Sequence, residues 1–102
     1  SIENDHKALY YYLKANSIDP NFKDAVFNIG LAYLKLDRTS ESINILKKAI
    51  LLDDKNSEYY KTLGLAMLIY NKEKEINNYD FCNQFKKACD NGDCEYLNQF
   101  CL

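Results

Sequence analysis

The chain has 102 residues, of which 47% are hydrophobic and 27% charged, with a formal net charge of −2 at pH 7. These values are typical of one globular domain. The small negative charge argues against nucleic acid and anionic membrane surfaces as partners, and no run of about 18 apolar residues is present to span a membrane. With three glycines and one proline, the chain has few turn signals for a β fold, so helices are expected.

Apolar residues recur at spacings of three and four, the period of an amphipathic helix. Val26, Ile29 and Tyr33 form one such face. Pro20 fixes a turn and disfavours helix at Asp19, so one helix ends there and another begins after it. In chain order, the expected helices are 4–17, 22–36, 40–52, 57–71, 79–90 and 93–101.

Helix starts are expected where a short polar side chain precedes an apolar run. Thr39 or Ser40 is the candidate N-cap of the third helix, and Ser57 is the candidate N-cap of the fourth. The polar stretch 71–79 (NKEKEINNY) indicates a longer loop or an overlong helix end.

A repeat of 34 residues runs through the middle of the chain. Residues 29–32 (IGLA) return as residues 63–66 (LGLA), and residues 14–15 (KA) return as residues 48–49. After Tyr70 the period slips by five residues, which corresponds to the extra length of the polar stretch. A helix–turn–helix repeat of this length is the signature of the tetratricopeptide repeat (TPR).

The chain resembles the TPR family over about nine-tenths of its length. Gly30 and Gly64 stand where that family packs helices closely, whereas Ser42 and Asp54 replace a preferred alanine and proline. The resemblance implies an all-α, right-handed TPR α-solenoid of antiparallel helix pairs, with about two and a half repeats plus a C-terminal helix. The single domain, 1–102, would divide into 4–20 (second helix of a partial repeat), 23–56 (TPR), 57–92 (TPR with an insertion at 71–79) and 93–102 (capping helix).

The family resemblance also implies a function, that of a protein–protein interaction scaffold. The first helix of each repeat lines the concave face, which would bind a protein or peptide partner. An upstream or C-terminal helix that covers this face is the alternative. The basic and asparagine clamp with which some TPR proteins hold chaperone C-termini is matched only by Asn28, which argues against that ligand. The candidate partner-binding residues are Phe27, Asn28, Leu31, Leu34, Lys35, Lys61, Leu65 and Leu68.

The four cysteines have mirror-image spacing, C-x6-C-x4-C-x6-C. Gly92 suits a turn at the centre, and two antiparallel helices joined there would place Cys82 opposite Cys101 and Cys89 opposite Cys94. Nested disulfides are the favoured interpretation of this geometry. Buried free thiols, a zinc site and a redox pair are alternatives, although the C-x2-C pairs typical of zinc and redox sites are absent.

The segment 81–101 also resembles the C-terminal TPR regions of bacterial cell-envelope proteins, in which a cysteine at the start of the last repeat's second helix faces one near the chain end. That resemblance covers Cys82 and Cys101. It implies an extracytoplasmic location, periplasmic or at the cell envelope; reduced cysteines would instead indicate the cytoplasm.

No catalytic group is evident, so no enzyme activity and no cofactor are expected. His6, the only histidine, lies near the N-terminus beside acidic residues and has no Ser or Asp partner in a recognisable motif. The first expected helix lacks its hairpin partner, which indicates a piece of a longer array or a helix that acts as a cap. Self-association through this exposed helix face is a further hypothesis, and monomeric behaviour independent of concentration would contradict it.

Overall fold

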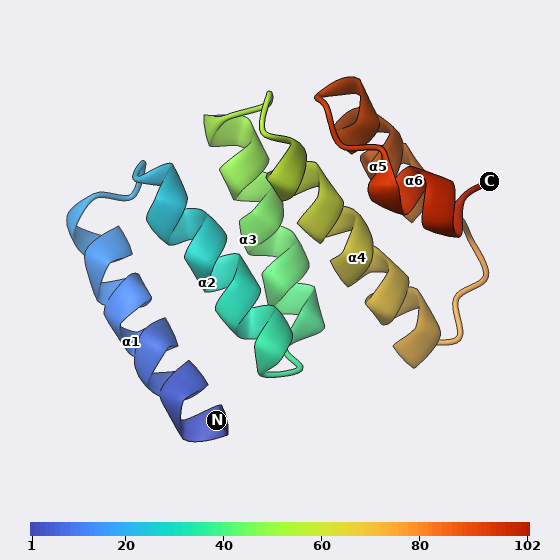
Figure 1. The fold of residues 1–102 in the computed structure, drawn as a ribbon. Coiled ribbons are helices and arrows are strands. Elements are labelled where there is room, and N and C mark those ends of the chain that lie inside the picture. The colour runs from blue at the N-terminus through green and yellow to red at the C-terminus, as the bar shows by residue number, and fades with distance from the viewer.

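Six α-helices and no strands make up the chain in a computed structural model that describes residues 1–102. Successive helices run in opposite directions, from α1 at one edge of the molecule to α5 and α6 at the other (Figure 1). The all-α solenoid predicted from the repeat is therefore confirmed. The helices are α1 (Ile2–Ile18), α2 (Lys23–Lys35), α3 (Thr39–Leu52), α4 (Ser57–Glu73), α5 (Phe81–Asp90) and α6 (Glu95–Phe100).

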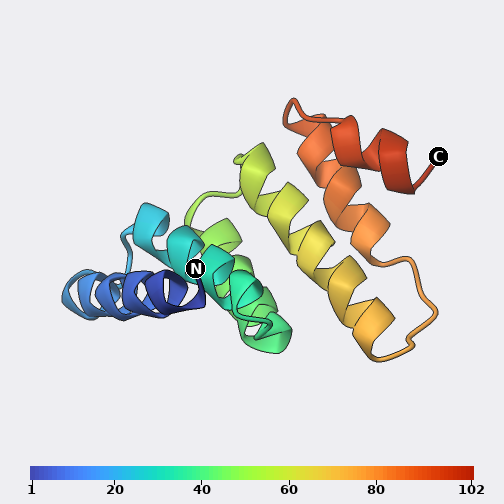
Figure 2. The same ribbon diagram turned by 60° about the horizontal axis from the view of Figure 1, so that its bottom comes forward.

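The hydrophobic core lies between helices, both within a hairpin and between successive hairpins. One cluster joins Leu9 of α1 to Ile29 and Ala32 of α2. Another joins Leu46 of α3 to α4 through Leu63 and Ala66. Figure 2 shows the helices stacked one after another, so that each inner helix contacts a neighbour on both sides. Because part of each apolar face is buried only by stacking on the next hairpin, each repeat is stabilised by its neighbour as well as by its own helix pair.

Both repeat glycines lie where two helices touch. A Cβ on Gly30 would lie 2.7 Å from Cδ2 of Leu46, and a Cβ on Gly64 would lie 2.5 Å from Cε1 of Phe85. Contacts this short are not tolerated in a close-packed interior. The close approach predicted from the recurrence of glycine is therefore confirmed.

Ser42, which replaces the family's alanine, has a structural role. Its side chain is fully buried, and its hydroxyl donates a hydrogen bond to the carbonyl oxygen of Gly30 at 2.7 Å. A buried hydroxyl is costly unless it is hydrogen-bonded. The substitution is thus accommodated by a polar contact between α2 and α3.

The predicted N-caps are wrong by one or two residues. Asn56, not Ser57, caps α4, since its side-chain oxygen accepts the Glu58 N–H at 3.0 Å. Arg38 occupies the N-cap position of α3 without a side-chain cap. The buried Thr39 hydroxyl instead donates to Glu73 at 3.3 Å and so links α3 to the end of α4. No helix is long and apolar enough to cross a bilayer.

Candidate interaction surfaces

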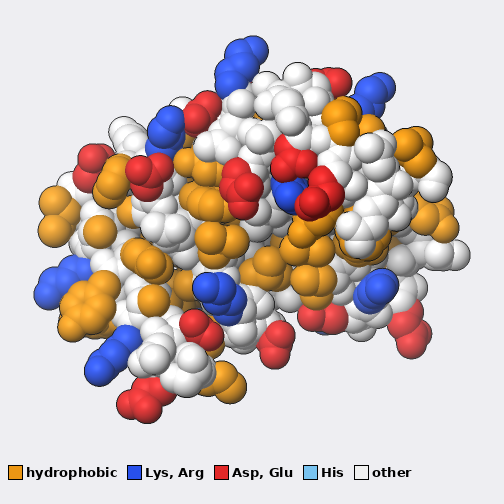
Figure 3. All heavy atoms as spheres, in the orientation of Figure 1, with side chains coloured by type: hydrophobic (Ala, Val, Ile, Leu, Met, Phe, Trp, Pro, Cys, Tyr) orange, Lys and Arg blue, Asp and Glu red, His pale blue; other side chains and the backbone are white.

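The eight predicted partner-binding residues all lie on α2 and α4. Lys35 is exposed, and the other seven are half-buried. Figure 3 shows hydrophobic side chains gathered in a band over the region of α1, α2 and α4. The structure divides the eight residues among four different environments.

Phe27 and Leu34 point from α2 toward α4. The Phe27 ring lies 4.7 Å from the ring of Tyr59, centroid to centroid, at an angle of 30°. Both side chains also pack against the buried cluster that contains Leu46 and Leu63. These two residues hold the repeats together and leave only part of their surface to a partner.

Asn28, Leu31 and Lys35 lie on the other side of α2, toward α1. Together with residues of α1 they line a small concave site, which we call the α1–α2 pocket. Ala8 and Tyr12 of α1, which the sequence did not single out, form its other wall. The full lining is Asp5, Ala8, Tyr12, Asn28, Leu31, Ala32 and Lys35.

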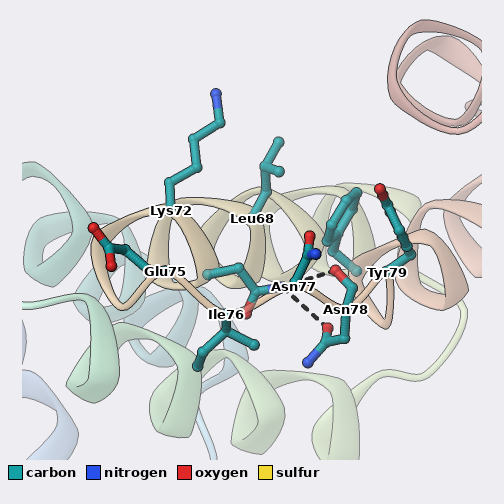
Figure 4. Close-up of a pocket in the computed structure, with 9 residues that line it drawn as sticks. Leu68, Lys72, Glu75, Ile76, Asn77, Asn78 and Tyr79 are labelled. Atoms are coloured by element: carbon teal, nitrogen blue, oxygen red, sulfur yellow. Dashed lines mark hydrogen bonds between the residues drawn. The ribbon is translucent and has the colours of Figure 1, made fainter.

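Leu65 and Leu68 are half-buried on α4. Leu68 lines a pocket of about 370 Å³ between the end of α4 and the inserted segment (Figure 4). Asn71, buried in the last turn of α4, organises this segment because its amide donates to the Asn78 side-chain oxygen at 3.0 Å and to the Asn78 carbonyl at 3.3 Å. The Ile76 N–H donates in turn to the Asn71 carbonyl at 2.8 Å. The first three residues of the polar stretch thus belong to α4, which ends at Glu73, and the rest form a loop.

Lys61 is engaged within the chain. Its ammonium group lies 2.9 Å from a carboxylate oxygen of Glu95 and 3.2 Å from one of Asp93. It also lies 4.4 Å from the centre of the Tyr96 ring, a cation–π distance. The C-terminal segment therefore covers this part of the predicted binding face.

These contacts, which hold α6 in place, shift the pKa values of Lys61 and Asp93. The hydrogen bond to Glu95, followed by the one to Asp93, raises the pKa of Lys61 above its usual range. The Glu95 backbone N–H, followed by Lys61, lowers the pKa of the Asp93 carboxyl. Both groups are consequently charged over the whole neutral range.

The structure pairs the four cysteines in the nested order expected from their spacing. Cys82 is bonded to Cys101 with a Cα–Cα distance of 5.9 Å, and Cys89 to Cys94 with a Cα–Cα distance of 4.0 Å. Gly92 between them has a φ of 111°, which a residue with a side chain rarely adopts. No cysteine is left free, and no group of three or more metal-ligating side chains is close enough to hold an ion.

Aromatic contacts complete the attachment of α6. The ring of Phe85, fully buried on α5, lies 5.5 Å from the Tyr96 ring and 5.8 Å from the Phe100 ring. Aromatic pairs at such distances add about 0.5–1.5 kcal/mol beyond burial. The short α6 is therefore held by two disulfides, a charged cluster and stacked rings.

Comparison with known proteins identifies the repeats. Residues 24–56 match the family model of the tetratricopeptide repeat. This segment is similar to a tetratricopeptide repeat, and the stacked antiparallel helices have the arrangement of a TPR solenoid. Repeats of this kind commonly form scaffolds for protein–protein interaction. No curated protein sequence matches this chain.

A solved structure shares this fold. It is MamA from AMB-1, which superposes with a TM-score of 0.72 at 21% sequence identity. The match covers 97% of this chain and 52% of that one, so this chain spans about half the length of the MamA chain. At this identity the likeness shows the fold alone.

The 34-residue repeat could have predicted that the C-terminal segment covers Lys61. Lys61 stands at the position of Phe27 in the preceding repeat, and Phe27 contacts the next first helix. The segment after Gly92 takes the place of such a helix and contacts Lys61 in the same way. A residue that faces the next repeat is thus expected to be covered whenever another helix follows.

Proposed function

We propose that the chain is an interaction scaffold that holds a partner peptide along the face of α2 and α4. The observation that carries this proposal is that four leucines of these two helices stay half-buried, Leu31 and Leu34 on α2 and Leu65 and Leu68 on α4. Large apolar side chains that stay partly exposed on neighbouring elements are typical of protein-binding surfaces. An apolar or amphipathic peptide fits their chemistry.

Polar contacts at the rim would orient such a peptide. Asn28 and the exposed Lys35 offer an amide and an ammonium group beside Leu31. Lys61 contributes only where a partner displaces Asp93 or Glu95, because both carboxylates already contact its ammonium group. The partner surface therefore centres on the leucines.

The test uses charge substitutions that spare the core. Leu31→Asp and Leu68→Asp place a carboxylate on the proposed face, and Leu51→Asp is the matched control because Leu51 lies on α3 and is 86% exposed. A protein that the intact chain captures from its source cell should be lost with the first two variants and retained with the control. Phe27→Ala is a poor probe since Phe27 stacks on Tyr59.

Folding of each variant is checked by circular dichroism before capture. Binding that persists at wild-type strength in folded Leu31→Asp and Leu68→Asp proteins would place the partner elsewhere. Loss of binding in the Leu51→Asp control as well would point to a general loss of structure rather than to the proposed face.

We further propose an extracytoplasmic location, in the periplasm or cell envelope. Its support is the pairing of all four cysteines, because structural disulfides persist in oxidising compartments and are rare in the cytosol. Mass spectrometry of protein taken directly from the source, with and without reductant, tests this location. Each bridge removes a pair of hydrogen atoms, whereas free thiols with stoichiometric zinc would favour the cysteine-rich zinc or redox hairpin instead.

A further inference from the structure

The turn between α5 and α6 contains Asn91–Gly92, where an asparagine is followed directly by glycine. No other asparagine of the chain has this neighbour. Glycine has no side chain to shield its backbone nitrogen, which can therefore attack the Cγ of the asparagine before it and close a succinimide ring. The same two residues lie inside the loop that the inner disulfide, Cys89–Cys94, closes. A pair prone to deamidation and a reducible bond thus share one turn.

The oxidised turn holds Asn91 in a geometry that does not react. Ring closure requires the Gly92 nitrogen to lie eclipsed with the Asn91 Cβ about the Cα–C bond. The ψ of Asn91 is 15°, which instead brings the Gly92 nitrogen close to eclipsing the Asn91 backbone nitrogen. The side chain is also tied back, since its Nδ2 donates to the Lys87 carbonyl oxygen at 2.8 Å. Closure therefore needs a rotation of the backbone and the loss of this hydrogen bond.

Two kinds of contact oppose that rotation. The Gly92 N–H donates to the Cys89 carbonyl oxygen at 3.0 Å, and the Asp93 N–H donates to the Ala88 carbonyl oxygen at 2.9 Å. Gly92 is exposed, so water competes for these bonds whenever the turn opens. The bond to Cys94 restricts the opening itself, because it joins residues five positions apart and leaves the backbone between them little freedom to rotate. The inner disulfide is therefore the strongest restraint on this turn.

We propose that Asn91 is a modification site that deamidates once a thiol reductant has opened the inner disulfide. Thiol–disulfide exchange leaves Cys89 and Cys94 as free thiols and oxidises the reductant to its own disulfide. The Gly92 nitrogen then bonds to the Asn91 Cγ, the bond from Cγ to Nδ2 breaks, and Nδ2 leaves as ammonia with the Gly92 proton. Water opens the succinimide at either carbonyl and gives aspartate or isoaspartate. This site goes beyond the peptide face of α2 and α4 and does not depend on it.

Deamidation makes the opening of the turn permanent. A carboxylate in place of the Asn91 amide loses the donor to the Lys87 carbonyl and adds negative charge at the C-terminus of α5, where the helix dipole disfavours it. Asp90 beside it adds like-charge repulsion. Isoaspartate also lengthens the backbone between Cys89 and Cys94. The inner disulfide should therefore re-form more slowly in the modified chain, so that a reversible reduction leaves an irreversible change.

Peptide mapping by mass spectrometry, after incubation of the full chain at neutral pH, measures the conversion of Asn91. The double variant Cys89→Ser, Cys94→Ser lacks the inner bridge without added reductant. It should convert Asn91 at least about tenfold faster than the oxidised wild type, because the opened turn is more populated. Cys82→Ser, Cys101→Ser is the matched control, since it removes the other bridge and leaves the turn closed. Its rate should stay close to that of the wild type.

A second comparison uses the Cys82→Ser, Cys101→Ser protein alone, with and without a phosphine reductant, and serves if the inner-pair variant does not fold. Circular dichroism checks that each sample is folded. Equal rates at Asn91 with the inner bridge open and closed would overturn the proposal. So would equal acceleration at Asn16, which precedes a serine on α1, because general unfolding rather than the inner bridge would then control the reaction.

Discussion

The ring of Phe85 occupies the space that a side chain on Gly64 would need. A Cβ there would lie 2.5 Å and 2.6 Å from two ring carbons and 3.2 Å from the Phe81 carbonyl oxygen. The ring is fully buried and is held on its other side by Tyr96 and Phe100. It has no room to retreat, so the contact fixes how closely α4 and α5 approach.

Gly64→Ala should therefore destabilise the fold by about 1–3 kcal/mol, even though alanine is the better helix former. Gly30→Ala should cost less, because its neighbour Leu46 offers side-chain atoms that can move and no backbone oxygen. Urea unfolding monitored by circular dichroism measures both changes. Equal stability of Gly64→Ala and the wild type would contradict the described packing.

Ser42→Ala should lower the free energy of unfolding by about 0.5–1.5 kcal/mol, because it removes the buried hydrogen bond to the Gly30 carbonyl. Ser40→Ala is the matched control. Ser40 is exposed, so its replacement should change stability by no more than about 0.5 kcal/mol. If the two variants were equally stable, the Ser42 hydroxyl would not stabilise the α2–α3 contact.

Removal of the outer disulfide with the double variant Cys82→Ser, Cys101→Ser should destabilise the chain by about 3 kcal/mol on the chain-entropy model, since the bridge spans 19 residues. The inner pair, Cys89→Ser with Cys94→Ser, spans 5 residues and should cost about 2 kcal/mol. Thermal unfolding ranks the two variants. Proteolysis should also cut α6 faster in the first variant, and a reversed ranking would show that the outer bridge is dispensable.

The attachment of α6 should depend on pH in a predictable direction. The pKa of Asp93 is lowered, so its contribution is present above the ordinary carboxyl pKa of about 3.9 and is lost as the pH falls through the lowered value. The pKa of Lys61 is raised, so its contribution is present below about 10.4 and is lost as the pH rises through the raised value. Between about pH 5 and 9 the attachment should be constant.

Hydrogen exchange of residues 95–100 measures this dependence. Protection should fall in acid in the wild type, and Lys61→Met should reduce the acid-dependent part while leaving both disulfides intact; the part that comes from the hydrogen bond between the Glu95 N–H and Asp93 should remain. Unchanged acid dependence in Lys61→Met would mean that the ion pairs to Asp93 and Glu95 do not hold α6.

The sequence was sufficient to predict the helices because the repeat applies the same packing rule twice. Gly30 and Gly64 could be recognised as contact points since each recurs beside an apolar face at the same spacing. The nested cysteine pairs could be predicted for a similar reason, as their spacing is symmetric about Gly92. In both cases residues that meet in the structure are separated by a regular spacing in the sequence.

Contacts made by segments that lie outside the repeat, or by residues that do not recur in it, could not be predicted in this way. Asn56 and Ser57 are both good N-caps, and only the observed backbone decides between them. Asn71 lies in a strongly polar run and is buried because the loop folds back on it. The correspondence of Lys61 with Phe27 indicates that Lys61 is covered, but its ion-pair partners, Asp93 and Glu95, depend on where α6 lies, and the repeat does not extend that far.

The disulfide between Cys82 and Cys101 joins the start of α5 to the residue that follows α6. Loss of the Lys61 ion pairs or of the aromatic contacts would therefore loosen α6 without releasing it from α5. Reduction of both bridges would leave only these non-covalent contacts, so the rigidity of the last two helices depends on the thiol–disulfide balance of their surroundings.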